Sequence, residues 1–325
     1  MSEILNVLYQ FDNNYAPYAG ISMLSLCENN KDIGAINIYC AAMDVAKENI
    51  QMLNATVEKY NRKIIYMNVQ SSLEQIRKMD ARPWNGSLAT WIKIFIIKEL
   101  IGKIDTLLYI DSDTLIVGSL KELCYFNFHG KAMACVIDAL AFPRLKRLKI
   151  EQNQYYFNAG IMFFNLRYFE GHNLFFHNMI DHLEKNIHRY SMNDQDLLND
   201  FFCDNIQKMN PKYNFQGVHF MYPDDIYYKV YGTYQYYSME EIKEGRADTR
   251  IIHYIRAVGD YPWDEGSYHP LRDEYLKWKN ISLWKNLPDR RKKRTPLFRF
   301  ERLLYLHLPK KIFLKILKFI TEHMI

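Results

Sequence analysis

The chain has 325 residues, and its shares of hydrophobic (49%) and charged (24%) residues exclude a disordered or fibrous protein. The formal net charge of +5 is unevenly spread. Residues 290–325 hold eleven Lys or Arg against two acids, while the remaining chain holds 31 basic against 35 acidic residues. A near-neutral body with a basic end differs from the uniformly basic surface of a nucleic-acid-binding protein, so we expect no nucleic-acid partner.

Cysteine use and hydropathy indicate where the protein works. The five cysteines show neither metal-ligand spacing nor a disulfide pattern, which favours a reducing compartment. No apolar stretch is long enough to predict a membrane-spanning helix, and the first residues do not have the pattern of a signal peptide. A chain of this length can bury one large α/β domain, here expected over 1–285, with a basic appendage at 286–325.

The first 70 residues alternate strand and helix patterns, which predicts a doubly wound sheet with parallel strands. The expected elements are strands at 4–10, 36–41 and 63–69 and helices at 17–28 and 46–60. No Gly-x-Gly-x-x-Gly and no P-loop is present, which argues against dinucleotide oxidoreductases and P-loop kinases. In the polar turn after the first strand, Asp12 or Asn14 either contacts a nucleotide or caps the helix that follows.

The apolar segment 106–117 is interrupted by two acids, Asp111 and Asp113. Its lack of polar alternation predicts a central strand buried on both faces, and the cost of burying charge places the acids at the carboxyl end of that strand. Carboxylates two residues apart in an extended chain point the same way, and their oxygens suit Mg²⁺ or Mn²⁺. The alternative is a turn with two solvated aspartates.

Further polar groups adjoin apolar segments along the chain. They are Lys93 in a helix at 86–101, Asp138 after a strand at 131–137, Asn158-Ala-Gly160 inside the apolar run 155–165, Asn193-Asp-Gln-Asp196 before a helix, and His253 in a strand at 250–254. A glycine inside an apolar run indicates a bulge or a close approach to the backbone. Acids at a helix start are ordinary caps when taken alone. We expect a loop at 142–155 and irregular strands and loops at 211–237.

Taken in order, these motifs resemble glycosyltransferase family 8, in particular its bacterial lipooligosaccharide galactosyl- and glucosyltransferases. The matching segments are 12–15, Asp111-Ser-Asp113, 156–160, 193–196, 252–254 and Pro262-Trp263, and the resemblance covers about 4–280. It implies a single Rossmann-like domain of the GT-A type. It also implies retaining transfer of glucose or galactose from a UDP-sugar to a saccharide or glycolipid acceptor in lipopolysaccharide or other cell-surface glycan synthesis.

The resemblance also implies roles for single residues. Asp111, Asp113 and His253 would hold Mn²⁺, with Mg²⁺ as the alternative ion, and neutral imidazole favours the former. Donor contacts would come from Asp12, Asn14, Lys93 and Asn158, and an acceptor contact from Asp138.

Gln195 and Asp194 would act at the transferred sugar. Because a glutamine is a poor nucleophile, we favour a front-face route in which the leaving diphosphate helps deprotonate the acceptor. The alternative is covalent catalysis by Asp194.

One segment departs from the family pattern. The family usually runs His-Tyr/Phe-x-Gly-x-x-Lys-Pro-Trp, with the lysine on the diphosphate. Here 253–263 is two residues longer and has Tyr261 in place of that lysine. We expect Arg256 to take over the phosphate contact, because its fork suits phosphate oxygens, and Gly259 to be a further donor-binding residue. The alternative is that Arg256 is an exposed loop residue.

The segment 286–325 contains two amphipathic helical patterns separated by Pro309. In the second, an apolar stripe (Phe313, Ile316, Leu317 and Ile320) runs beside Lys311, Lys315 and Lys318. Such helices lie in the interface of anionic membranes, which predicts peripheral association with the inner face of the plasma membrane. The alternative is a helix packed on the body or on a second subunit.

Two rival functions stay open from the sequence. The altered lid would also fit a catalytically silent nucleotide-sugar-binding protein. The aspartate pair would also fit a metal-dependent phosphohydrolase, although the sequence lacks the further acid cluster that a two-metal site needs.

Overall fold

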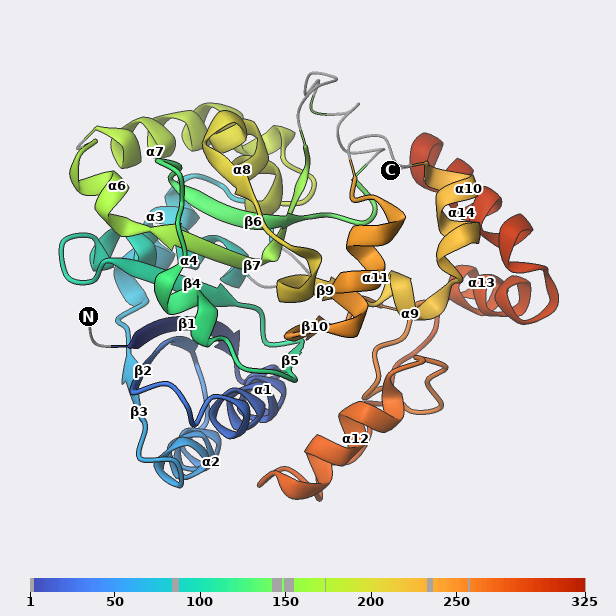
Figure 1. Cartoon of the computed structure of the whole chain (residues 1–325), viewed down its shortest axis with the longest axis horizontal. Helices are drawn as coiled ribbons and strands as arrows, with labels where there is room; N and C mark the ends of the chain where they lie inside the picture. Colours follow the sequence, from blue (N-terminus) through green and yellow to red (C-terminus); the bar gives the residue numbers. More distant parts are fainter. Residues whose placement is uncertain are drawn as a thin grey trace.

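The computed structural model describes residues 3–83, 88–141, 148, 155–172, 174–232, 236–256 and 258–324. Its central layer is a seven-stranded sheet with the order β3-β2-β1-β4-β7-β6-β8 (Figure 1). The strands are β1 (Ile4–Asp12), β2 (Ala35–Met43), β3 (Lys63–Tyr66), β4 (Thr106–Ile110), β6 (Met133–Ile137), β7 (Phe157–Asn165) and β8 (Ile206–Lys208). β1 to β4 run parallel, and β7 runs antiparallel to both of its neighbours. The predicted α/β class with a mostly parallel sheet is confirmed.

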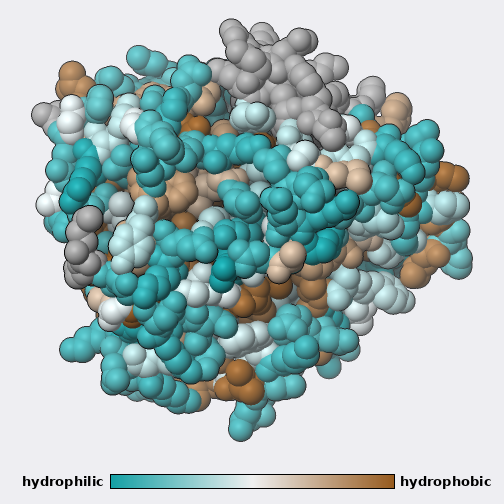
Figure 2. All heavy atoms as spheres, in the orientation of Figure 1, coloured by the Kyte–Doolittle hydropathy of each residue, from teal (hydrophilic) through white to brown (hydrophobic). Residues whose placement is uncertain are grey.

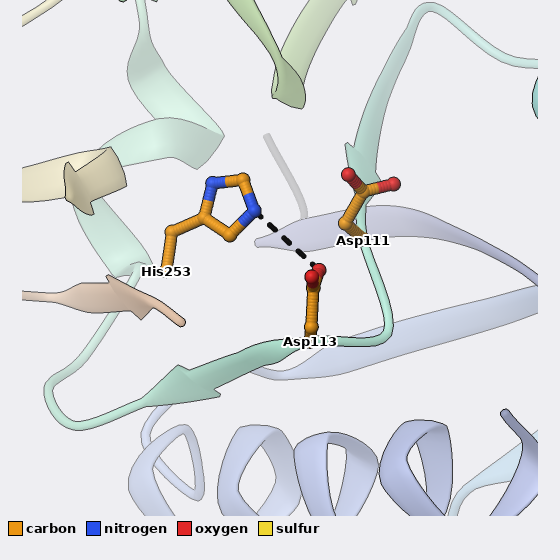
Figure 3. Close-up of side chains that lie close together, drawn as sticks. All are labelled: Asp111, Asp113 and His253. Carbon is orange, nitrogen blue, oxygen red and sulfur yellow. Dashed lines mark ion pairs between the residues drawn. The ribbon is translucent and has the colours of Figure 1, made fainter. Parts of the chain in front are cut away.

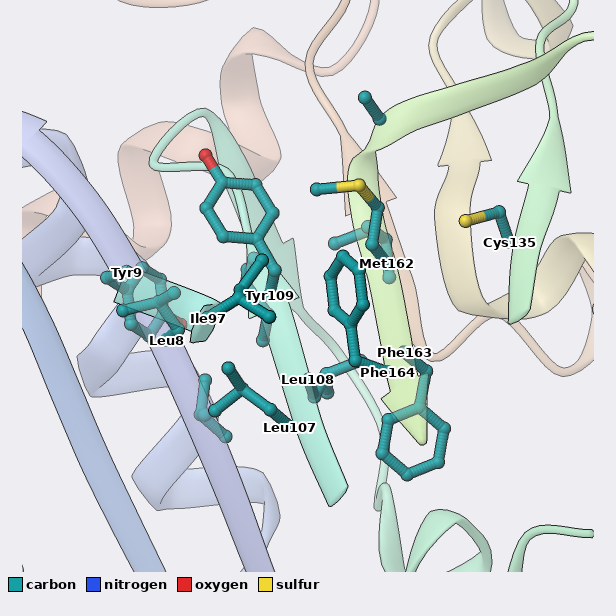
Figure 4. Close-up of a cluster of buried hydrophobic side chains, with 14 of the residues drawn as sticks. Leu8, Tyr9, Ile97, Leu107, Leu108, Tyr109, Cys135, Met162, Phe163 and Phe164 are labelled. Carbon is teal, nitrogen blue, oxygen red and sulfur yellow. The ribbon is translucent and has the colours of Figure 1, made fainter. Parts of the chain in front are cut away.

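The first half of the chain winds helices around this sheet as the alternating pattern predicted. They are α1 (Ala16–Asn29), α2 (Lys47–Glu58), α3 (Gln70–Lys78) and α4 (Ala89–Leu100). Strand β4 is buried on both faces, as its uninterrupted apolar pattern predicted. Figure 4 shows its Leu107, Leu108 and Tyr109 packed beside Phe163 and Phe164 of β7. This packing fixes the strand whose end carries Asp111.

A second, three-stranded sheet consists of β5 (Thr114–Ile116), β10 (Ile251–His253) and β9 (Phe215–Gln216), in the order β5-β10-β9. The apolar segment 106–117 is therefore divided between two sheets, with β4 in the large sheet and β5 in the small one. The tripeptide Asp111-Ser-Asp113 forms the crossing between them. Its two carboxylates lie at the carboxyl end of the buried strand, as predicted.

The second half of the chain is more helical than the sequence suggested. Its helices are α6 (Leu166–Glu170), α7 (Phe175–Asn186), α8 (Asp194–Phe202), α9 (Val218–Met221), α10 (Asp224–Tyr231), α11 (Met239–Ala247), α12 (Arg272–Ile281), α13 (Pro296–His307) and α14 (Lys310–Met324). The prediction of irregular strands and loops at 211–237 is wrong for α9 and α10. The predicted loop at 142–155 falls mostly on 142–147 and 149–154, which lie outside the described residues.

Helix α10 forms because one of its faces is covered and its first turn is acidic. Asp224 and Asp225 lie in that first turn, where carboxylates stabilise the positive end of the helix dipole. Tyr227 and Val230 point inward and pack against Phe313 of α14 within one apolar cluster. Tertiary packing therefore overrides the strand preference of the tyrosine-rich sequence.

Both predicted tail helices are present as α13 and α14, and α14 packs against α10 on the body (Figure 1). One residue of the apolar stripe that we expected to face a membrane is instead buried against the body: Phe313 is 2% exposed, and its neighbour Leu314 is fully buried. No helix among the described residues combines the length and the apolar character needed to cross a bilayer.

Candidate active site

Three side chains converge where the two sheets meet: Asp111 after β4, Asp113 before β5, and His253 at the end of β10 (Figure 3). Antiparallel pairing sets His253 opposite Thr114, the residue after Asp113, and Tyr254 N–H donates to the Asp113 carbonyl at 2.9 Å. One ligand atom from each of the three side chains lies within 4.8 Å of the other two. The structure therefore brings together the three residues that the sequence proposed as metal ligands.

The donor set suits a divalent cation. Burial raises the pKa of the Asp111 carboxyl to about 6, and repulsion from Asp113 adds to the effect. Burial lowers the pKa of His253, but the two carboxylates outweigh it and hold that pKa above its ordinary value. Nε2 of His253 lies 3.4 Å from Oδ1 of Asp113. Two partly buried acids with one imidazole are stabilised when a cation takes the place of the proton they would otherwise share.

A hydrogen bond at Nδ1 sets the orientation of the His253 ring. Its Nδ1 lies 3.0 Å from Oδ1 of Asn214, so Nδ1–H donates to that amide and the lone pair of Nε2 faces the carboxylates. The Asn214 amide in turn donates to Oδ1 of Asn158 at 2.9 Å. Asn214 was missed from the sequence, because it lies in the segment where no motif was apparent.

A buried amide and carboxylate cluster continues from Asn158. Nδ2 of Asn158 and Nε2 of Gln195 both donate to Oδ2 of Asp138, at 3.0 and 3.1 Å. Oε1 of Gln195 accepts from Ala159 N–H at 3.1 Å, so both ends of this amide are held. The three side chains are each less than 10% exposed. The structure thus gathers three predicted site residues into one network joined to the metal ligands through Asn214.

Lys93 and Asp194 form a buried ion pair. Nζ of Lys93 lies 2.7 Å from Oδ2 of Asp194, with side chains 3% and 7% exposed. Burial raises the pKa of Asp194, and the charge of Lys93 opposes that rise. Nζ of Lys93 also lies 4.0 Å from the ring centroid of Tyr109, whose hydroxyl donates to Asp111. Lys93 therefore lies close to Asp111, and its charge opposes the rise of the Asp111 pKa.

The side chains of the segment Asn193-Asp-Gln-Asp196 make contacts of different kinds. Asp196 holds the turn before α8: its carboxylate accepts from Met192 N–H at 2.8 Å and from the hydroxyl of Tyr156 at 2.7 Å. Asp194 instead pairs with Lys93, and Gln195 joins the amide and carboxylate cluster. A structural role thus accounts for Asp196 and leaves Asp194 and Gln195 for the site.

Asp12 is the last residue of β1 and begins the loop that leads to α1. Its Oδ1 accepts from the backbone N–H groups of Asn14 and Tyr15, both at 3.0 Å, and so shapes the turn before α1. Asn14 is exposed beside it and Tyr15 is half-buried. This loop lies beside the metal ligands, since the Asp113 carboxylate raises the pKa of the Tyr15 hydroxyl, in addition to the effect of burial.

The lid segment after His253 returns toward the same loop. Arg256 is exposed, with Cζ 6.0 Å from the ring centroid of Tyr261. Tyr261 stacks on Trp263 at 4.8 Å between ring centroids. Gly259 has φ +81° and packs against Phe298 of α13, so a Cβ there would lie 2.8 Å from that ring. The lid segment therefore contacts helix α13 of the tail as well as lying near the site.

A model of glycosyl transferase family 8 matches residues 6–266. The chain belongs to glycosyltransferase family 8. It is 29% identical over 313 residues to a lipopolysaccharide 1,2-glucosyltransferase of Escherichia coli, with 93% of this chain and 86% of that protein covered. The predicted family and the predicted class of enzyme, a glycosyltransferase, are confirmed.

Solved structures show the same fold as this family 8 enzyme. The galactosyltransferase LgtC, solved in complex with donor and acceptor sugar analogues, matches with a TM-score of 0.67 at 19% identity, covering 91% of this chain and 99% of LgtC. The bifunctional glycosyltransferase WbbM, solved in its apo form, matches with a TM-score of 0.69 at 21% identity and covers 88% of this chain. Our chain spans about half, 51%, of the WbbM chain.

Proposed function

We propose that this family 8 enzyme is a retaining hexosyltransferase that moves glucose or galactose from a UDP-sugar to a saccharide or glycolipid acceptor. The carrying observation is the unbroken connection from Asp111, Asp113 and His253 through Asn214 to the cluster of Asn158, Asp138 and Gln195. The proposed metal ligands and the buried amide and carboxylate network are thus joined by hydrogen bonds. The similarity to a lipopolysaccharide 1,2-glucosyltransferase supports a role in lipopolysaccharide or other cell-surface glycan synthesis.

The metal is proposed to be Mn²⁺, with Mg²⁺ as the alternative, held by Asp111, Asp113 and His253. An imidazole in a set of oxygen ligands favours Mn²⁺, because Mg²⁺ prefers oxygen ligands alone. When bound, the ion supplies positive charge that stabilises the leaving diphosphate. Asp12, Asn14, Arg256 and Gly259 are proposed as donor contacts from the loop and the lid, and Asp138 as an acceptor contact.

The held amide of Gln195 supports a front-face route. Its oxygen accepts from Ala159 N–H and it carries no negative charge, so it is poorly suited to attack the anomeric carbon. Asp194, the alternative nucleophile, is already neutralised by Lys93 at 2.7 Å. In the proposed step the bond from the anomeric carbon to the phosphate oxygen breaks while the acceptor oxygen bonds to the same face. The acceptor proton passes to the departing diphosphate.

The tail helices are proposed to hold the enzyme peripherally on the inner face of the plasma membrane. Six large apolar side chains of α13 and α14 are about half exposed or more: Leu297, Phe300, Leu303, Leu306, Ile312 and Phe319. Figure 2 shows brown, hydrophobic atoms at the right-hand edge, where Figure 1 places these helices. Arg299, Lys311 and Lys315 are exposed on the same helices, and each cation near an anionic surface contributes about 1 kcal/mol.

UDP release tests the proposed function. Wild-type enzyme is incubated with UDP-glucose, UDP-galactose and other UDP-sugars, with Mn²⁺ or with EDTA, beside Asp113→Ala and the exposed-site control Asp273→Ala. We expect metal-dependent release from one hexose donor, lost in Asp113→Ala and retained in Asp273→Ala. If neither turnover nor UDP binding is found in Mn²⁺, the proposal is wrong.

A further inference from the structure

The basic linker before α13, residues 289–295, is joined to the end of the lid by two backbone hydrogen bonds. Arg290 N–H donates to the carbonyl of Trp263 at 2.8 Å, and Glu265 N–H donates to the carbonyl of Arg290 at 3.1 Å, which makes a bridge between Asp264 and Arg290. Nε of Arg290 lies 2.6 Å from Oδ1 of Asp264, whose side chain is fully buried. Both the backbone and the side chain of Arg290 are therefore fixed in place.

The guanidinium of Arg290 lies between the lid and the loop that follows β1. Its Cζ is 5.4 Å from the ring centroid of Tyr261, and its charge lowers the pKa of the Tyr15 hydroxyl. Arg256 approaches the same Tyr261 ring at 6.0 Å. Two arginines from distant parts of the sequence thus meet at one tyrosine, in the lid position where a cation was expected from the sequence.

These cations lie within electrostatic reach of the metal-binding site. After burial, the Asp113 carboxylate is the strongest influence raising the pKa of the Tyr15 and Tyr261 hydroxyls. Arg290 and Arg256 both lower the pKa of the same two hydroxyls. A metal ligand and two guanidinium groups therefore act on the same pair of phenols.

The cluster carries more positive charge than its contacts offset. Nζ of Lys292 donates to the carbonyl of Gly259 at 2.6 Å, a neutral partner. Burial lowers the pKa of Lys292, and repulsion from Arg256 and Arg290 lowers it further against the pull of nearby acids. Within the described part of the chain, Asp264 is the carboxylate in direct contact with Arg290. Positive charge gathered beside a cation site suits a ligand that is itself an anion and bridges the two.

We propose that Arg290 is a donor-binding residue whose terminal N–H groups bind the diphosphate of the nucleotide sugar, with Arg256 as a second ligand. This inference rests on the proposed function. Nε of Arg290 is used by Asp264, which leaves the two terminal nitrogens as donors in the planar arrangement that matches phosphate oxygens. Arg290 lies in the segment that we predicted to be part of the membrane tail. It then supplies the positive charge that is missing because Tyr261 replaces the usual lysine.

Binding measurements on matched variants test the proposal. Dissociation constants for UDP, and for uridine as the ligand without phosphates, are measured in Mn²⁺ for wild type, Arg290→Gln and Arg291→Gln. Arg291 belongs to the same linker and carries the same charge, but its side chain is 93% exposed. Arg290→Gln is expected to weaken UDP binding about tenfold to a hundredfold and to leave uridine binding unchanged. Arg291→Gln is expected to match wild type.

Two outcomes separate the inference from the function on which it rests. No UDP binding by wild type sinks the proposed function itself, whereas normal UDP binding by Arg290→Gln overturns only the role of Arg290. Because Arg290→Gln leaves the Asp264 charge buried without its partner, the double variant Asp264→Asn/Arg290→Gln is measured as well. We expect the double variant to recover thermal stability while UDP binding stays weak. Recovery of UDP binding as well would show that Arg290 is only a structural tie.

Discussion

The ring of His253 lies against the backbone of Gly160 so closely that no side chain fits between them. A Cβ at Gly160 would fall 2.2 Å from Cε1 and 2.8 Å from Nδ1 of His253, and 3.0 Å from Oδ1 of Asn158. The glycine that the sequence marked as a point of close approach is thus approached by His253, a proposed metal ligand. The backbone carbonyl of Gly160 also accepts from Asp111 N–H at 2.8 Å. Both Asp111 and His253 are therefore in contact with Gly160 of β7.

Replacing Gly160 by alanine should therefore damage the metal site more than the fold. The added methyl must displace the His253 ring, and overpacking of this kind costs about 1–3 kcal/mol. We expect a large loss of Mn²⁺ affinity, measured by calorimetry, and of metal-dependent UDP release. Gly171→Ala is the matched control, since a Cβ there would meet only one carbonyl, at 3.7 Å. Unchanged Mn²⁺ affinity in Gly160→Ala would refute this account of the glycine.

The second prediction concerns Asn214, which fixes the tautomer of His253. Asn214→Leu removes the acceptor for Nδ1–H and the donor to Asn158, so the ring is free to turn its lone pair away from the carboxylates. Outer-shell changes of this type lower metal affinity about 10–100-fold. A Mn²⁺ titration of the variant measures the loss. Asn178→Leu, an exposed change in α7, should titrate like wild type; if Asn214→Leu did too, the tautomer would be set in another way.

Some residues of the site were predicted from the sequence and others were missed, and the difference has a physical reason. Asp111 and Asp113 were placed correctly because burial of β4 is visible locally, as an apolar run without alternation. Asn214 and α10 were missed because their environment comes from residues far away in the chain: Asn214 from His253, and α10 from Phe313. A local pattern carries no signal for contacts of that range.

The contacts between the lid and the linker were even harder to predict from the local sequence. Asp260 is 1% exposed and pairs with Arg294 at 3.0 Å and Arg302 at 2.7 Å, while Asp264 pairs with Arg290. In the sequence these arginines look like a uniform basic run, because charge alone does not tell which members are exposed. Packing against the lid separates them into partly buried partners of aspartates and exposed residues such as Arg291.

The third prediction separates membrane binding from this structural role of the linker. Phe300→Ser in α13 and Phe319→Ser in α14 change apolar residues that are 58% and 60% exposed. Together they should reduce flotation with vesicles containing phosphatidylglycerol while UDP release stays normal. Leu174→Ser, at a residue 68% exposed near the start of α7, is the control for loss of any exposed apolar group. Equal flotation of all three proteins would sink the peripheral anchor.

Truncating the chain before Arg290 would be a less specific test of membrane association by the tail helices. It would strip Asp260 and Asp264 of their arginine partners and leave two buried charges uncompensated, which costs several kcal/mol each. We expect such a truncation to lower the melting temperature and to weaken UDP binding, even without membranes. A truncated chain with wild-type stability and UDP affinity would show that the linker contacts contribute little.

The last prediction concerns acid stability and rests on His269, beneath the lid. Its Nε2–H donates to the carbonyl of Ile255 at 3.1 Å and its Nδ1 accepts from Leu271 N–H at 3.1 Å, so the ring is held neutral. Burial lowers its pKa to about 4, from an ordinary value of 6.5. Between these two values the unfolded chain binds a proton that the folded protein does not. The contribution to stability is therefore complete above pH 6.5 and is lost, at about 1.4 kcal/mol per pH unit, as the pH falls toward 4.

Substituting His269 by glutamine removes this titration while keeping an amide donor for Ile255. At pH 7 we expect His269→Gln to be somewhat less stable than wild type, because the acceptor for Leu271 N–H is changed. Between pH 6.5 and 4.5 its free energy of unfolding, measured by denaturant titration, should fall less steeply than that of wild type. His177→Gln, at a side chain 69% exposed, controls for loss of a histidine as such. Parallel pH profiles for wild type and His269→Gln would mean that His269 is not held neutral in the folded state.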